Sequence, residues 1–161
     1  NSNSSYYTGG GSGNTYVNNG AQSTTGNVWG VYDMSGGAWE YVAAYVNNGN
    51  SSLTSYGNSL YTSTDSKTKN VYAKGSSDNN SSNYSANAGV YGDAVYETSA
   101  NGNTINGSWY GDYSNFPNTD WPFFYRGGSY LAGSNAGVFY FNNNNGNGNS
   151  NRSFRPVLVA L

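Results

Sequence analysis

The 161-residue chain contains no cysteine and no histidine. Without cysteine it has no disulfide, no thiol nucleophile and no thiolate-bound zinc. Without histidine it lacks the usual general base near neutral pH and the usual transition-metal ligand. These two absences exclude the commonest nucleophilic and metal-assisted reactions, although a lack of cysteine does not fix the redox compartment.

Charged residues are also scarce: they make up 9% of the chain, with a net charge of −2. The sequence therefore offers no basic patch for nucleic acid and no polybasic segment for anionic lipid. It also lacks an apolar stretch long enough to span a membrane. We expect neither nucleic-acid binding nor direct membrane insertion.

Aromatic residues are abundant, with 17 Tyr and 4 Trp. Disordered chains usually combine many charges with few aromatics, so this composition predicts a folded domain with an aromatic core and a neutral polar surface. We expect a linker or first strand over residues 1–22 and one domain over 23–161. Because Asn1 is neither a Met nor part of a signal-like segment, we expect the remainder of a longer surface polypeptide to precede it.

Short apolar segments separated by long polar ones predict an α+β domain. Apolar runs predict strands at 121–131, 136–141 and 153–159. Helices are expected only near 38–46 and around 84–97, and the segment 52–61 is a brief candidate for either a strand or a helix. Long loops within a compact domain need something to hold them, and without disulfides a bound ion is a natural candidate.

Three segments carry a resemblance to a known family. They read GVYDMSGGAWEY at 30–41, RGGSY at 126–130 and SFRPVLV at 153–159. In this order they resemble the formylglycine-generating-enzyme-like (sulfatase-modifying factor) domains. The resemblance implies a C-type-lectin-like fold of the formylglycine-generating-enzyme subtype, with short mixed sheets and long structured loops. The large aromatic side chains of the first segment and its flank, including Trp29 and Trp39, are expected to be buried.

A turn at Gly36 and Gly37 separates two carboxylates in the first segment. One interpretation is an Asx turn with Glu40 solvated or paired with an arginine. The other is a structural Ca²⁺ site, since calcium prefers carboxylate and main-chain oxygens. The resemblance favours calcium, bound by the side chains of Asp33 and Glu40 and the carbonyls of Gly36 and Ala38. Gly37 replaces the asparagine usual in the family, which leaves the ligand set open.

Catalysis is not expected. The catalytic members of the family use a pair of cysteines and a related branch uses three histidines, and this chain has neither. Carboxylates such as Asp112 and Asp120 could serve as an acid and base pair, but the acidic residues are scattered and none has a recognisable catalytic setting. We therefore assign no catalytic residue.

The asparagine-rich segment 142–152 lies between two apolar flanks near the end of the chain. These flanks predict a tethered loop that displays its side chains; the alternative is a merely solvated loop of low complexity. Residues 130–152 also resemble the diversified segment of diversity-generating-retroelement variable proteins. The predicted ligand-binding residues are Tyr130, Leu131, Tyr140, Asn142, Asn143, Asn144, Asn145, Asn147, Asn149, Asn151 and Arg152.

The frame around this surface is expected to consist of Phe139, Phe141, Phe154 and Arg155. Serine in place of residues 142–145 should then leave stability nearly unchanged. The predicted function is a non-enzymatic, extracellular binding domain at the tip of a bacterial or phage surface protein, with a protein or glycan ligand on another surface. The alternatives are a carbohydrate-binding module, whose Tyr or Trp platforms stack on sugars, and a structural surface domain without a ligand.

Overall fold

The protein is an α+β domain built on one mixed β-sheet. The computed structural model describes residues 25–30, 38–89, 94–99, 102–104, 107–129 and 137–154. In chain order the elements are β1 (Trp39–Asn47), α1 (Ser52–Thr62), β2 (Asn70–Ala73), α2 (Asn80–Ala86), α3 (Ala94–Thr98), β3 (Asn103–Thr104), the 3₁₀ turn η3 (Trp109–Gly111), β4 (Ser114–Asn115), β5 (Phe123–Arg126), β6 (Phe141–Asn144) and β7 (Arg152–Ser153). The expected class is confirmed, whereas the linker predicted for residues 1–22 lies outside the described residues.

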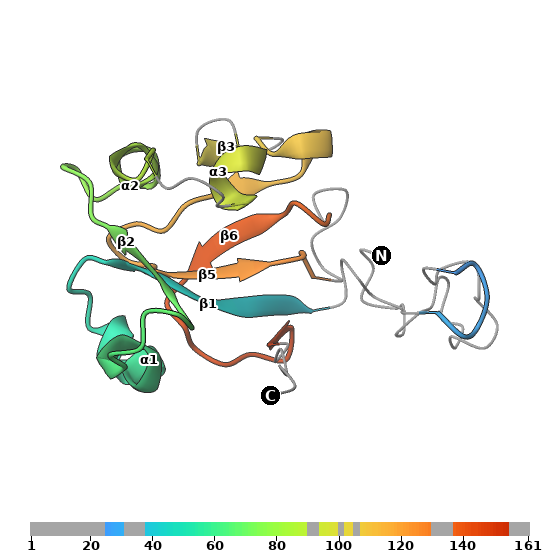
Figure 1. The fold of residues 1–161 in the computed structure, drawn as a ribbon, viewed down its shortest axis with the longest axis horizontal. Helices are drawn as coiled ribbons and strands as arrows, with labels where there is room; N and C mark the ends of the chain where they lie inside the picture. Colours follow the sequence, from blue (N-terminus) through green and yellow to red (C-terminus); the bar gives the residue numbers. More distant parts are fainter. Residues whose placement is uncertain are drawn as a thin grey trace.

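The sheet has the order β2-β1-β5-β6-β4-β3, and β7 joins it beside β1. Strand β5 lies antiparallel to one edge of β1, and two parallel strands share the other edge. On that shared edge β7 pairs with Trp39 and Glu40, and β2 pairs from Ala44 onward. Residues 41–43 separate the two short partners. Figure 1 shows α1 on one side of the sheet and α2 and α3 on the other.

The helix predicted near 38–46 is wrong, because this segment is the long strand β1. Both faces of β1 are covered, so its sequence is apolar almost throughout and lacks the alternation typical of a half-buried strand. Ala44 and Val46 pack with the core on the α2 and α3 side, whereas Tyr45 packs with Leu53 of α1. The segment 52–61, for which the sequence left strand and helix open, is the helix α1. The helix predicted around 84–97 is found as two short helices, α2 and α3.

The larger core cluster is aromatic, as the composition predicted. Phe116 is fully buried and lies within ring-contact distance of Tyr72, Tyr84 and Phe124, with ring centroids 5.2, 5.8 and 4.9 Å away. These pairs are edge-to-face, the geometry that the ring quadrupole favours. Aromatic side chains fill this core because the chain has few aliphatic residues.

Asparagine side chains hold the loops in place in the described part of the chain. From the sequence, a bound ion was expected to do this. The Asn83 side chain is fully buried; its amide donates to the Pro117 carbonyl at 3.0 Å and to Asp78 Oδ1 at 2.9 Å, and its carbonyl accepts from Gly75 N at 2.7 Å. The Asn87 amide pairs with both backbone groups of Ala73, as a neighbouring strand would. Each amide combines a donor and an acceptor, so it can satisfy two different loops at once.

Candidate functional site

The first part of the predicted ligand surface is a buried strand. Residues 141–144 form β6, which lies between β5 and β4 inside the sheet. Tyr140 and Asn143 are 4% and 3% exposed, and Asn151 is 8% exposed, so the expectation that these three face solvent is wrong. Tyr130 and Leu131 lie outside the described residues.

The asparagines of β6 bond to the sheet. Asn143 donates to the Phe116 carbonyl at 2.8 Å, and Asn144 accepts from the Tyr41 hydroxyl at 2.6 Å. The Asn142 carbonyl oxygen accepts from the amide of Asn115 at 3.1 Å. Serine at these positions would lose such bonds, so the expected neutrality of the 142–145 replacement conflicts with the structure. The strand predicted at 136–141 is wrong over residues 137–140, which are not part of a strand, and β6 runs from Phe141 to Asn144 instead. Asparagine has low strand propensity, which explains why the sequence did not extend a strand into the run.

The second part of the run forms a loop between β6 and β7, tethered at both ends as expected. Asn149 is exposed, and Asn145 and Asn147 are half-buried. The Asn147 carbonyl accepts from the Tyr41 hydroxyl and from the guanidinium of half-buried Arg152, each at 3.1 Å. We call residues 145–151 the asparagine loop; its conformation is set by contacts with the sheet.

Next to this loop lies a groove of about 900 Å³, which we call the α1 groove. Its lining residues come from β1, α1, β5, the start of the asparagine loop and the position after β7: Tyr41, Val42, Ser55, Tyr56, Gly57, Asn58, Ser59, Leu60, Phe123, Gly146 and Phe154. None of these described lining residues is charged. Tyr56 and Phe154 are 55% and 73% exposed. Phe154 was expected in the buried frame, and that prediction is wrong, whereas Phe141 is fully buried as predicted.

Two glycines bring the walls of the groove close to its floor, Phe123. At Gly146, where φ is +95°, an added Cβ would lie 2.8 Å from the Phe123 ring and 2.9 Å from Tyr56 Cβ. At Gly57 it would lie 2.4 Å from Phe123 Cζ, and the helix departs there from helical geometry. An Asn-Gly step in the loop therefore has a packing reason, because only glycine permits this approach.

A cluster of tyrosines adjoins the groove. Trp39 is half-buried and stacks on Tyr125 with centroids 4.8 Å apart, whereas Trp29, also expected in the core, is 89% exposed. Burial raises the pKa of Tyr125, Tyr41 and Tyr140 above the usual value of 10.0. These phenols therefore stay protonated at neutral pH. The Tyr41 hydroxyl donates to Asn144, and the Tyr140 hydroxyl accepts from the Asn142 amide at 3.1 Å.

The remaining predicted residues do not assemble into a site within the described residues. Asp33 and Gly36 of the calcium prediction lie outside these residues, Ala38 directly precedes β1, and the half-buried Glu40 lies in it. One carboxylate and one carbonyl fall short of the six to eight oxygen ligands that calcium takes, so the other ligands would have to come from outside the described residues. Asp112 is buried and its Oδ2 accepts from Phe139 N at 2.9 Å, a structural role.

The three segments that carried the family resemblance meet at the start of β1. Glu40 pairs with Arg126 of the second segment and with Ser153 of the third. No helix in the described part of the chain is long and apolar enough to cross a membrane. Comparison of the chain with family models, with curated proteins and with solved structures finds no match.

Sequence reasoning missed the α1 side of the groove. The segment 52–61 was recognised only as a brief strand or helix candidate, and its Tyr56-Gly57 pair gave the one usable signal. Glycine within a helix costs about 1 kcal/mol relative to alanine, so a glycine at such a position suggests that another group approaches closely there.

Proposed function

We propose that the protein is a non-enzymatic binding domain whose ligand lies in the α1 groove and against the asparagine loop. The observation that carries this proposal is the pair of exposed aromatic side chains, Tyr56 and Phe154, on the walls of an uncharged concavity. Ligand sites are typically concave and largely apolar, with a few polar groups that orient the ligand. The groove has this character, with Ser55, Asn58 and Ser59 as its polar groups.

We further propose that the domain is a non-catalytic member of the formylglycine-generating-enzyme-like group, with the C-type-lectin-like fold of that subtype. Support comes from the meeting of its three signature segments around β1. The second segment also has a physical reason for its two glycines, because Gly127 and Gly128 have φ values of +84° and +66°. L-residues with a side chain rarely adopt this conformation.

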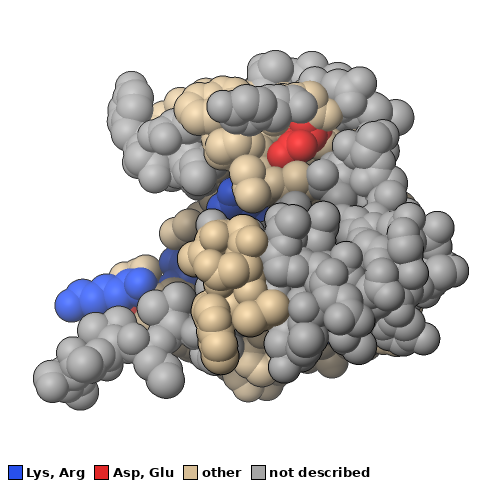
Figure 2. All heavy atoms as spheres, turned by 90° about the vertical axis from the view of Figure 1, so that its right-hand side faces the viewer, with Lys and Arg blue, Asp and Glu red and all other residues tan. Residues whose placement is uncertain are grey.

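The neutral polar surface suits an extracellular setting on a bacterial or virion surface, within a longer polypeptide. Figure 2 shows the scarcity of charge directly: uncharged side chains make up most of the described surface on that face. If the loop is diversified by a retroelement, the changes should fall on its less buried positions, Asn145, Asn147 and Asn149. A change at Asn143 would remove a contact of the sheet.

The groove favours a glycan over a flat protein surface as ligand. Aromatic faces stack on the apolar faces of sugar rings, and hydroxyl and amide side chains bond to sugar hydroxyls. Carbohydrate binding is therefore the second candidate function that the geometry supports.

A glycan array followed by titration of the best neutral oligosaccharide tests both statements. Tyr56→Ala and Phe154→Ala should each weaken binding at least tenfold, while Trp121→Ala, which removes a similarly exposed aromatic outside the groove, should leave it unchanged. Equal loss in all three variants, or full binding in the two groove variants, would contradict the proposal. If no glycan binds, but a protein ligand binds and Tyr56→Ala and Phe154→Ala weaken its binding, the binding domain is supported and the carbohydrate ligand is rejected.

A further inference from the structure

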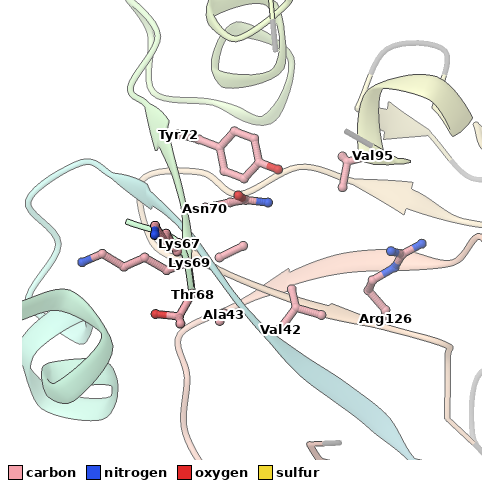
Figure 3. Close-up of a pocket in the computed structure, with 10 residues that line it drawn as sticks. Val42, Ala43, Lys67, Thr68, Lys69, Asn70, Tyr72, Val95 and Arg126 are labelled. Carbon is pink, nitrogen blue, oxygen red and sulfur yellow. The ribbon is translucent and has the colours of Figure 1, made fainter. Parts of the chain in front are cut away.

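The structure has a second cavity, of about 380 Å³. We call it the Arg126 pocket. Figure 3 shows Arg126 of β5 on one side and the segment 67–70 on the other, with Val42 of β1 between them. Arg126 follows Phe124 by two residues, so both side chains lie on the face that α2 and α3 cover.

Basic residues line this pocket, although the Lys69 ammonium is directed to the end of α1. The chain has six Lys and Arg residues, and three of them, Lys67, Lys69 and Arg126, line the cavity. No acidic residue is among its described lining residues. In the same loop the Asp65 carboxylate accepts from the backbone N of Lys67 at 2.8 Å, and Glu40, the cross-strand neighbour of Arg126, takes part in other interactions.

The three cations differ in how they are held. Lys69 is structural: its Nζ donates to the carbonyls of Leu60 and Ser63 at 2.9 and 2.5 Å, at the end of α1. Arg126, in contrast, is half-buried, and its guanidinium has no hydrogen bond or ion pair to any residue that the structure describes. A half-buried guanidinium loses part of its hydration, and the described residues supply no acceptor in exchange. A bound anion would offset that cost.

We infer that the Arg126 pocket binds the carboxylate of a small organic acid of about the size of one acidic sugar. Arginine binds carboxylates through two parallel N–H···O bonds, a geometry that gives specificity as well as affinity. Val42 and Val95 supply an apolar wall for the body of the ligand, and the exposed Thr68 and Asn70 supply polar groups at the rim. The volume lies at the small end of ligand sites, which suits a single ring.

This inference stands apart from the proposed function, because the two cavities share only Val42 among their described lining residues. Lys and Arg atoms are visible in a hollow between uncharged parts of the surface in Figure 2. A cation at such a depth is screened less by salt than one on an open surface.

The test is a titration of the ¹⁵N-labelled protein with D-glucuronate, with D-glucose as the neutral match and inorganic phosphate as a simple anion. We expect glucuronate to shift the signals of Asn70 and Val95, which line this pocket only, and to bind at least tenfold more tightly than glucose. Arg126→Gln should weaken glucuronate binding at least tenfold, and Arg126→Lys should recover part of it. Lys74→Gln, the same charge change at an exposed site outside the pocket, should have little effect.

Several results would overturn the inference. Equal binding of glucuronate and glucose would show that the carboxylate is not recognised. Phosphate binding as tight as that of glucuronate would mark a simple anion site. Shifts confined to Tyr56 and Ser59 would place the ligand in the α1 groove. Melting curves of the Arg126 variants establish that each is folded. If Arg126→Gln unfolds, glucuronate binding by Arg126→Lys is compared with that by Lys74→Gln. Equal affinity of these two variants would then overturn the inference.

Discussion

Replacement of Asn83 by alanine should destabilise the fold more than any exposed asparagine replacement. The side chain is fully buried on α2 and makes three hydrogen bonds, two to the turn at residues 75–78 and one to Pro117. Alanine would leave the buried Gly75 N–H and Pro117 carbonyl without this partner, at about 1–3 kcal/mol each. The better helix propensity of alanine would return about 0.5 kcal/mol. We expect a net loss of about 2–5 kcal/mol, a large part of the stability of an ordinary domain.

Urea unfolding followed by tryptophan fluorescence measures this loss. With a denaturant slope of about 2 kcal/mol per molar, a loss of about 3 kcal/mol lowers the midpoint by about 1.5 M. Asn83→Asp should be as harmful at neutral pH, because it replaces the donor that faces Pro117 and Asp78 with an acceptor. Asn58→Ala, at an exposed position of α1, should change stability by less than about 0.5 kcal/mol. A midpoint for Asn83→Ala equal to that of Asn58→Ala would refute the structural role of the buried amides.

Three further predictions concern the groove, the tyrosines and calcium. Gly146→Ala should cost about 1–3 kcal/mol in urea unfolding, because of its positive φ and its contact with Phe123, whereas Gly148→Ala has open space and should be nearly neutral; equal effects would reject this packing. Because burial raises the pKa of Tyr125 above 10.0, its contribution to stability is complete below pH 10 and is lost as the pH rises through the raised value. The fall in urea midpoint between pH 9 and pH 11.5 should therefore be shallower in Tyr125→Phe, and identical slopes would contradict the assignment. If Glu40 helps to bind calcium, a chelator should lower the melting temperature of the natural chain but not of Glu40→Ala, and identical melts with calcium and chelator would exclude the site.

The aromatic composition of the core could be predicted from the sequence. Abundant Tyr and Trp predicted a folded aromatic core, which is found around Phe116. This prediction succeeds because it depends on a hydrophobic property that each residue carries wherever it lies. The predicted turn at Gly36 and Gly37 lies outside the described residues, and the positive φ values of Gly127 and Gly128 were not predicted.

The direction in which each side chain points was much harder to predict. Val46 and Tyr45 are adjacent in β1 and belong to different core clusters, so an apolar run covered on both faces was mistaken for a helix. Phe154, assigned to the frame by its apolar character, lies exposed on the wall of the α1 groove. The exposure of a side chain depends on the neighbours that distant segments bring to it, and the pattern of residues around it in the sequence does not show which these are.

The asparagine run shows most clearly what the sequence determines and what only the tertiary structure decides. Its composition determined that the segment would be uncharged, and its apolar flanks predicted that it would be tethered at both ends. Only the tertiary structure decided that Asn143 is an internal sheet residue while Asn149 faces solvent. An amide is equally suited to either place, because it bonds as well to a buried carbonyl as to water. Its role is therefore set by the partners that distant segments bring to it, such as the Phe116 carbonyl at Asn143.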